Sequence, residues 1–186
     1  MVGLSIQKDI LNSRINTRKI ALLSILSAAA IASNYLLIGV TNVKFMDLIV
    51  FTSGFIMGPM MGAMTGVMVW LVYGTINPFG FSLPILIATM TGEAMFGIAG
   101  GYYTKSEQAS GVGVNLWTAV IGFIVTFVYD VFTNIISAYS VGIPISIGLV
   151  TGIPFMLAHV LSNTVFFGVG FRPLSRSISK VLGEKL

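Results

Sequence analysis

Apolar runs alternate with short polar or Gly/Pro-containing breaks along the whole chain. The breaks read GVTN, MGPM, TINPFGFS, TKSEQASGVG and SVGIP. They leave six apolar segments, which span residues 18–38, 43–57, 60–75, 83–103, 115–140 and 146–171. Because a helix needs about 20 apolar residues to cross a bilayer, the pattern predicts an all-α bundle of six transmembrane helices. The second and third segments are short and rich in glycine, which indicates close packing or tilt.

Composition supports the membrane assignment. Hydrophobic residues make up 55% of the 186 residues and charged residues only 9%, whereas a soluble domain carries about 25% charged residues. We therefore expect one transmembrane domain over residues 1–186, with 1–17 as a lead-in, 18–171 as the six spans and 172–186 as a tail. The chain has no cysteine, which excludes disulfides and thiolate chemistry.

The cations are distributed unevenly between the two sides of the predicted bundle. Nine of them precede the first span, follow the fourth or follow the sixth: Lys8, Arg14, Arg18, Lys19, Lys105, Arg172, Arg176, Lys180 and Lys185. Because cytoplasmic loops are enriched in Lys and Arg, both termini are predicted to be cytoplasmic. Lys44, at the start of the second span, is the remaining cation and falls on the outer side.

The N-terminal segment allows a second interpretation. Its basic residues, the apolar ALLSILSAA and the small-residue stretch AAAIAS also resemble a secretory signal peptide with its cleavage site. Cleavage would remove the first span. We expect the segment to be retained.

Polar side chains recur at helical spacing inside three of the spans. One helical face of the fifth span carries Asp130, Thr133, Asn134 and Ser137. In the fourth span, Glu93 lies between Thr89 and Gly97. One face of the sixth span carries His159, Ser162 and Asn163. A charge at the centre of a bilayer helix costs about 2.5–3.5 kcal/mol, so a partner or ligand is expected. Converging stripes would form a polar pocket within the membrane. Alternatively, these groups satisfy one another and only join the helices.

Motifs for catalysis and for ATP binding are absent from the sequence. It contains no HExxH, GxSxG or P-loop, and one histidine gives too few nitrogen ligands for a typical zinc site. We therefore expect no enzyme activity, no cofactor and no bound metal. A stand-alone proton-coupled carrier is the alternative function, because Glu93, Asp130 and His159 could relay protons. No broken-helix pair or inverted repeat supports that alternative.

Small residues form stripes on two spans. In the first span Ala21, Ser24, Ala28 and Ala32 follow one another at helical spacing, which permits close approach of another helix. Docking of a partner and internal packing explain that stripe equally well. For Gly58, Gly62 and Gly66 of the third span we expect internal packing.

The order of these features resembles the substrate-binding S component of energy-coupling factor (ECF) vitamin transporters. The likeness rests on the AxxxA of the first span, the stretch NVKFMDLIVFTSGFIMGPMMGAMTGVMVWLVYG, and the polar segments TMTGEAMFGIAGG, YDVFTN and PFMLAHVLSN. The resemblance implies a subunit of a prokaryotic cell membrane that captures a vitamin or related micronutrient at its outer side. It would deliver the substrate together with a transmembrane T component and two ABC-type ATPases.

The resemblance also assigns roles to residues. It implies that Ser24, Ala28 and Ala32 face the T component. The pocket would be formed by the outer halves of spans four to six and capped by outer loops. The residues of this chain that match the family's pocket positions are Glu93, Asp130, Asn134, His159, Asn163, Lys44, Asp47 and Asn77. Trp70 and Tyr73 would either stack on the substrate or belong to an interfacial aromatic belt.

The kind of substrate is only partly indicated. Cobalt and nickel members of this family carry a histidine close to Met1, and the start MVGLS has none, so a metal cargo is not expected. The acidic groups and His159 favour an amine-bearing substrate such as a thiamine-like molecule. Lys44 could meet an anionic group. Flavin, pterin and corrin-type substrates remain open.

Overall fold

A computed structural model describes residues 17–76, 78–103 and 113–183, and this part of the chain is helical without strands. The elements are α2 (Thr17–Leu36), α3 (Met46–Met57), α4 (Pro59–Ile76), α5 (Leu83–Tyr102), α6 (Leu116–Val141), α7 (Ile145–Val165), the π-helical turn η2 (Phe166–Gly170) and α8 (Phe171–Leu182). Helices α2 to α7 correspond to the six predicted spans. Five continuous helical segments are long and apolar enough to cross a membrane, so the chain is a multi-pass, all-α membrane protein. The side on which the termini lie stays a prediction.

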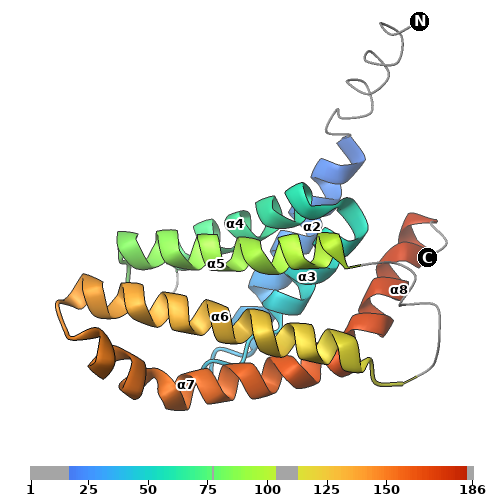
Figure 1. Cartoon of the computed structure of the whole chain (residues 1–186). Coiled ribbons are helices and arrows are strands. Elements are labelled where there is room, and N and C mark those ends of the chain that lie inside the picture. Colours follow the sequence, from blue (N-terminus) through green and yellow to red (C-terminus); the bar gives the residue numbers. More distant parts are fainter. Residues whose placement is uncertain (1–16, 77, 104–112, 184–186) are drawn as a thin grey trace, which may run out of the picture.

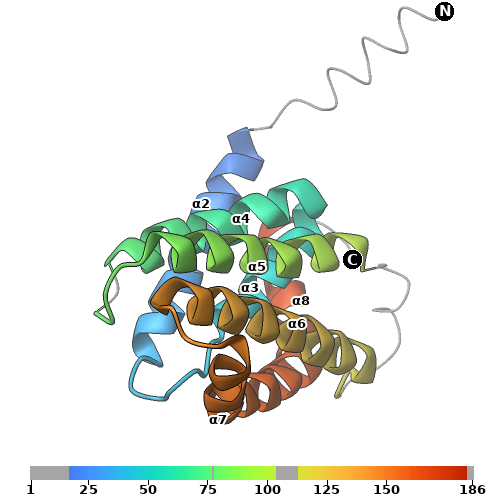
Figure 2. The same ribbon diagram turned by 60° about the vertical axis from the view of Figure 1, so that its left-hand side comes forward.

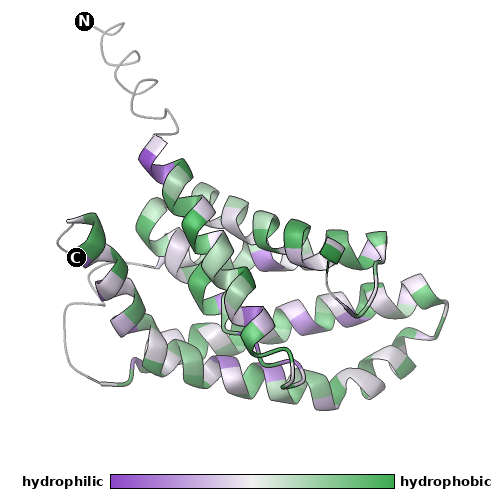
Figure 3. Cartoon of the chain, turned by 180° about the vertical axis from the view of Figure 1, so that it is seen from behind, coloured by the Kyte–Doolittle hydropathy of each residue, from purple (hydrophilic) through white to green (hydrophobic). Residues whose placement is uncertain are grey.

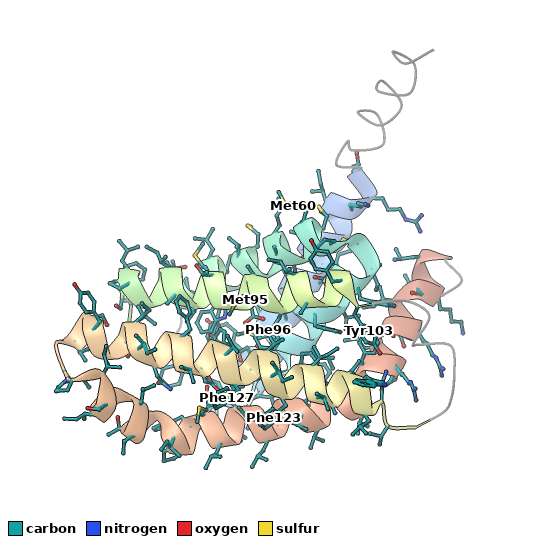
Figure 4. The ribbon with its side chains drawn as sticks, viewed as in Figure 1. Met60, Met95, Phe96, Tyr103, Phe123 and Phe127 are labelled. Atoms are coloured by element: carbon teal, nitrogen blue, oxygen red, sulfur yellow. The ribbon has the colours of Figure 1, made fainter. Side chains whose placement is uncertain are left out.

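The helices form two groups with α3 between them. Helices α2, α4 and α5 lie on one side, the antiparallel pair α6 and α7 lies on the other, and α8 lies near the end of α3 (Figures 1 and 2). Apolar residues dominate along the helices, whereas the start of α2 is polar (Figure 3). Phe123 and Phe127 of α6 stack on each other on the outside of the bundle, and Phe96 and Tyr103 lie inside it (Figure 4). The outward apolar surface is what a lipid environment requires.

Helix α3 is the buried centre of the molecule. Eleven of its 12 residues are buried, and it packs against α2, α4, α5 and α8. At a rise of about 1.5 Å per residue the helix is roughly 18 Å long, which is shorter than the hydrocarbon core of a bilayer. The predicted span 43–57 was therefore too long at its start, because residues 43–45 belong to the connection that follows α2.

Glycines allow three helix backbones to touch. A Cβ atom added to Gly97 of α5 would lie 2.1 Å from the carbonyl carbon of Gly62 in α4, and one added to Gly54 of α3 would lie 1.9 Å from the carbonyl oxygen of Gly97. A Cβ on Gly66 would meet the backbone of Glu93 at 2.7 Å. Internal packing is therefore confirmed for Gly62 and Gly66.

Between α3 and α4 the chain turns at Gly58. This residue has a φ of 97°, a backbone conformation that residues with a Cβ rarely adopt. Pro59 then begins α4, at the helix position where its missing N–H costs least. Gly58 thus serves the turn rather than a helix contact, and nothing lies within 4 Å of a Cβ placed on it.

The C-terminal segment is more ordered than a simple tail. The π-helical turn η2 links α7 to α8, and its carbonyl groups find partners on α6: the Thr118 hydroxyl donates to the Phe167 oxygen at 2.8 Å and the Asn115 N–H to the Gly168 oxygen at 2.7 Å. Helix α8 then buries Phe171 against the core. Arg18 at the start of α2 donates to the carbonyl of Leu182. The predicted tail 172–186 is thus helical as far as Leu182.

Candidate functional site

The structure contains a cavity of about 620 Å³, lined in part by residues of α6 and α7. It lies toward the end of the bundle where these two helices are connected; Figure 1 shows this end, opposite α8. Its lining comes from the end of α2, the connection between α2 and α3, helices α4, α5, α6 and α7, and the turn before α5. The lining residues are Asn34, Leu37, Ile38, Val40, Thr41, Asn42, Val43, Lys44, Trp70, Tyr73, Phe79, Gly80, Ile85, Thr89, Tyr129, Asp130, Thr133, Asn134, Ser137, Phe155 and Met156. The pocket thus draws on more elements than the outer halves of spans four to six.

The polar stripe of α6 faces this cavity. Asp130, Thr133, Asn134 and Ser137 all line it, as the helical spacing predicted. The stripe does not merely pack against a neighbouring helix, because three of its four members are partly exposed. Helix α6 therefore supplies a carboxylate, an amide and two hydroxyls to one wall.

Beneath the cavity, His159 bridges two carboxylates from different helices. Its Nε2 lies 2.6 Å from Asp47 Oδ2 on α3, and its Nδ1 lies 2.9 Å from Asp130 Oδ1 on α6. The imidazole is fully buried. Because each ring nitrogen faces an acceptor, the histidine holds both carboxylates in fixed positions without lining the cavity itself.

The same buried network continues on either side of Asp47. The Asn163 amide donates to Asp47 Oδ2 at 2.6 Å and to Thr126 Oγ1 at 2.9 Å. Glu93 accepts a hydrogen bond from Trp70 Nε1 at 3.1 Å and is close enough to Asp47 to interact with it electrostatically. The predicted ionisable residues thus converge, but Glu93, His159, Asn163 and Asp47 lie below the pocket wall rather than on it.

Several buried polar atoms of the network have no partner among the described residues. They are Asp47 Oδ1, Glu93 Oε1, Tyr129 Oη, Asp130 Oδ2 and Asn163 Oδ1. Two of them belong to residues that line the cavity. A buried polar atom without a hydrogen bond is costly in free energy, so these two atoms mark the places where a ligand or water would bind.

Aromatic rings form the opposite wall. Trp70 and Tyr73 of α4 are each less than a tenth exposed and line the cavity, so their rings do not form an interfacial belt. The Lys44 ammonium lies 5.1 Å from the ring centroid of Trp70 and 5.3 Å from that of Tyr129. Both distances are within the range of a cation–π interaction.

The connection between α2 and α3 covers part of the cavity. Asn42 has a φ of 56° and its side chain donates to the carbonyl oxygen of Phe155 on α7 at 2.8 Å. That bond joins the connection to the far wall.

Many residues of the site are among those expected from the sequence, and others are not. Asn77 falls outside the described residues. Asn34, Tyr129 and Thr126 were not predicted; the first two line the cavity and the third supports Asn163. An amide near the outer end of an otherwise apolar span was the available signal for Asn34. Nothing in the sequence distinguishes Tyr129 from the other aromatic residues of its span.

The site can hold a small molecule, and its volume falls within the range of about 300–1,000 Å³ that is common for ligand pockets. Within the described ranges, no three acidic or histidine side chains are grouped as a metal site. The chain matches no family model, and neither a curated protein nor a solved structure shows significant similarity to it.

Proposed function

We propose that the chain is the substrate-capture subunit of an ECF-type importer in a prokaryotic cell membrane. It binds a vitamin or related micronutrient at its outer side and delivers it together with a T component and two ABC-type ATPases. The observation that carries the proposal is the cavity of about 620 Å³ at one end of a helical membrane bundle. Its wall combines a carboxylate, amides and aromatic rings.

The exposed face of α2 supports a docking role. Ser24, Ala28 and Ala32 are exposed, whereas Leu23 and Ala30 of the same helix are buried in the core. Internal packing therefore does not account for the small-residue stripe. A flat surface of small side chains lets a second transmembrane helix approach closely, as docking on a T component requires.

An importer of this kind depends on ATP hydrolysis by its partner subunits, which distinguishes it from a carrier that works alone. The sequence has no P-loop, so partners would supply ATP hydrolysis. Purified chain reconstituted in liposomes with the T component and both ATPases should accumulate a labelled vitamin when ATP is present. Liposomes with inactive ATPases are the matched control. Equal accumulation in both preparations would contradict the proposal.

A stand-alone proton-coupled carrier is the second candidate function. One observation favours it: His159 lies between Asp47 and Asp130 within hydrogen-bonding distance of both, an arrangement that could pass a proton. Liposomes that contain the chain alone, with an inward proton gradient and the same vitamin, test it. Concentrative uptake without partners would establish the carrier and exclude the capture subunit.

A further inference from the structure

The cavity presents two opposite charges that do not satisfy each other. Asp130 Oδ1 is engaged by His159, which leaves Oδ2 buried and without a hydrogen-bond partner at the cavity wall. Lys44 lines the same cavity. Its ammonium group lies over two aromatic rings and forms no salt bridge with a carboxylate of the described residues.

A ligand with one charge would leave either Asp130 Oδ2 without a hydrogen-bond donor or the Lys44 ammonium without an acceptor at the cavity wall. A purely cationic ligand could pair with Asp130 but would be repelled by Lys44, and a purely anionic ligand would meet the reverse situation. A ligand that carries both charges would satisfy the two groups at once through charge-assisted hydrogen bonds. The desolvation of each group on binding would then be compensated.

The shape of the pocket adds a third requirement. Trp70, Tyr73 and Tyr129 come from two helices and line the same cavity as these charged groups. Aromatic walls of this kind favour a flat ring system, which gains both apolar burial and stacking. The available volume suits a ring with short substituents.

We propose that the cavity binds an aromatic zwitterion, whose ammonium group donates to Asp130 Oδ2 and whose anionic group accepts from the Lys44 ammonium. The inference rests on the proposed capture function and names the chemical class of its substrate. His159 acts as a positioning residue, because its Nδ1 engages Asp130 Oδ1 and leaves Oδ2 without a partner in the protein. Trp70 and Tyr73 contact the ring.

A matched series of indole compounds tests this assignment. The probes are L-tryptophan as the zwitterion, tryptamine as the cation, indole-3-propionate as the anion, and indole as the neutral ring. Binding is measured by saturation-transfer NMR and calorimetry on the full chain in lipid nanodiscs. Probe concentrations of up to about 10 mM allow dissociation constants as weak as about 1 mM to be detected. We expect L-tryptophan to bind at least about fivefold more tightly than either singly charged analogue, since each charged hydrogen bond contributes more than a neutral one.

Two variants assign the charges. Lys44→Met should remove the preference for L-tryptophan over tryptamine and keep that over indole-3-propionate, and Asp130→Asn should do the reverse. Lys180→Met, which removes an exposed cation of α8, is the control and should change neither preference. Thermal unfolding of each variant verifies that it is folded. Because Lys44 is only partly buried in a connection between helices, its variant decides the question if Asp130→Asn does not fold.

Other outcomes overturn the inference. If tryptamine binds as tightly as L-tryptophan or more tightly, the site is one for cations. If both variants keep the wild-type preferences, Lys44 and Asp130 are not the groups that recognise the two charges. If no probe binds, this class of ligand is excluded. These results leave the capture function standing. That function fails separately, if no vitamin accumulates in liposomes that contain all partners and ATP.

Discussion

His159 is the residue on which the buried polar network depends, because it is in contact with carboxylates of both α3 and α6. Replacement by leucine keeps the volume approximately but leaves Asp47 and Asp130 without that partner. Breaking a buried charged pair in this way costs about 3–5 kcal/mol. We expect His159→Leu to lower the midpoint of thermal unfolding, measured in detergent by intrinsic fluorescence.

Ser162→Ala provides the matched control on the same helix. The Ser162 hydroxyl donates only to the carbonyl of His159 within its own helix, at 3.0 Å, so its loss should change the midpoint little. If His159→Leu unfolds at the same temperature as the wild type, the bridge contributes nothing to stability.

At this scale the sequence predicted which residue types would gather but not which pairs they would form. Helical spacing alone placed Asp130 and Asn134 on one face, and both line the cavity. The pairing of Asp47 with His159 joins positions 112 residues apart, and such a contact depends on how α3 lies against α7. Spacing along one helix holds no information about that arrangement.

Helix α2 exposes a row of small residues on its outer surface. Ala28 and Ala32 are exposed, so a tryptophan at either position should fit the isolated chain and leave its stability and ligand affinity unchanged. A bulky ring would separate the backbones of two closely packed helices. We expect Ala32→Trp to reduce co-purification with the T component and ATPases at least about tenfold, the effect of some 1.4 kcal/mol.

The control for this docking experiment is a tryptophan on another exposed surface. Thr151 on α7 is a small, exposed residue, and Thr151→Trp should co-purify normally. Co-purification of Ala32→Trp at the wild-type level would show that the α2 stripe is not the docking surface.

The contact between α4 and α5 gives a second prediction for helices. A Cβ atom on Gly97 would lie 2.1 Å from backbone of Gly62, so Gly97→Ala must force the two helices apart. Overpacking of this kind costs about 1–3 kcal/mol or more, and we expect a lower unfolding midpoint. Gly39→Ala, where nothing lies within 4 Å of the added carbon, should unfold like the wild type. Equal midpoints for both variants would contradict the described packing.

The extents of the helices were largely predictable, and the exceptions have physical reasons. Long apolar runs with Gly and Pro at their ends fixed α5 and α6 to within a few residues. The start of α3 was placed too early because Val43 and Phe45 are apolar and continue the hydrophobic run of the helix, although Lys44 lies between them. Helix α8 was missed because hydropathy does not detect a polar helix that packs only one face, with Phe171 and Ser175 buried.

For the whole molecule, the distribution of cations predicts that both termini face the cytoplasm. The absence of cysteine from the sequence allows a direct test with single introduced cysteines. Thr41→Cys, at an exposed position beside the cavity, should react with a membrane-impermeant maleimide in intact cells. Ser177→Cys on α8 should react only after permeabilisation, and the opposite pattern would invert the topology.

The shortness of α3 also constrains how the protein enters the membrane. A segment of 12 residues is too short to be held across the bilayer by its own hydrophobicity, since about 20 apolar residues are needed. It also carries Asp47, whose hydrogen-bond partners lie on α7, the last of the six helices. During synthesis the Asp47 carboxylate therefore lacks these hydrogen-bond partners until α7 has been made. The final position of α3 is therefore reached only after α7 has been synthesised.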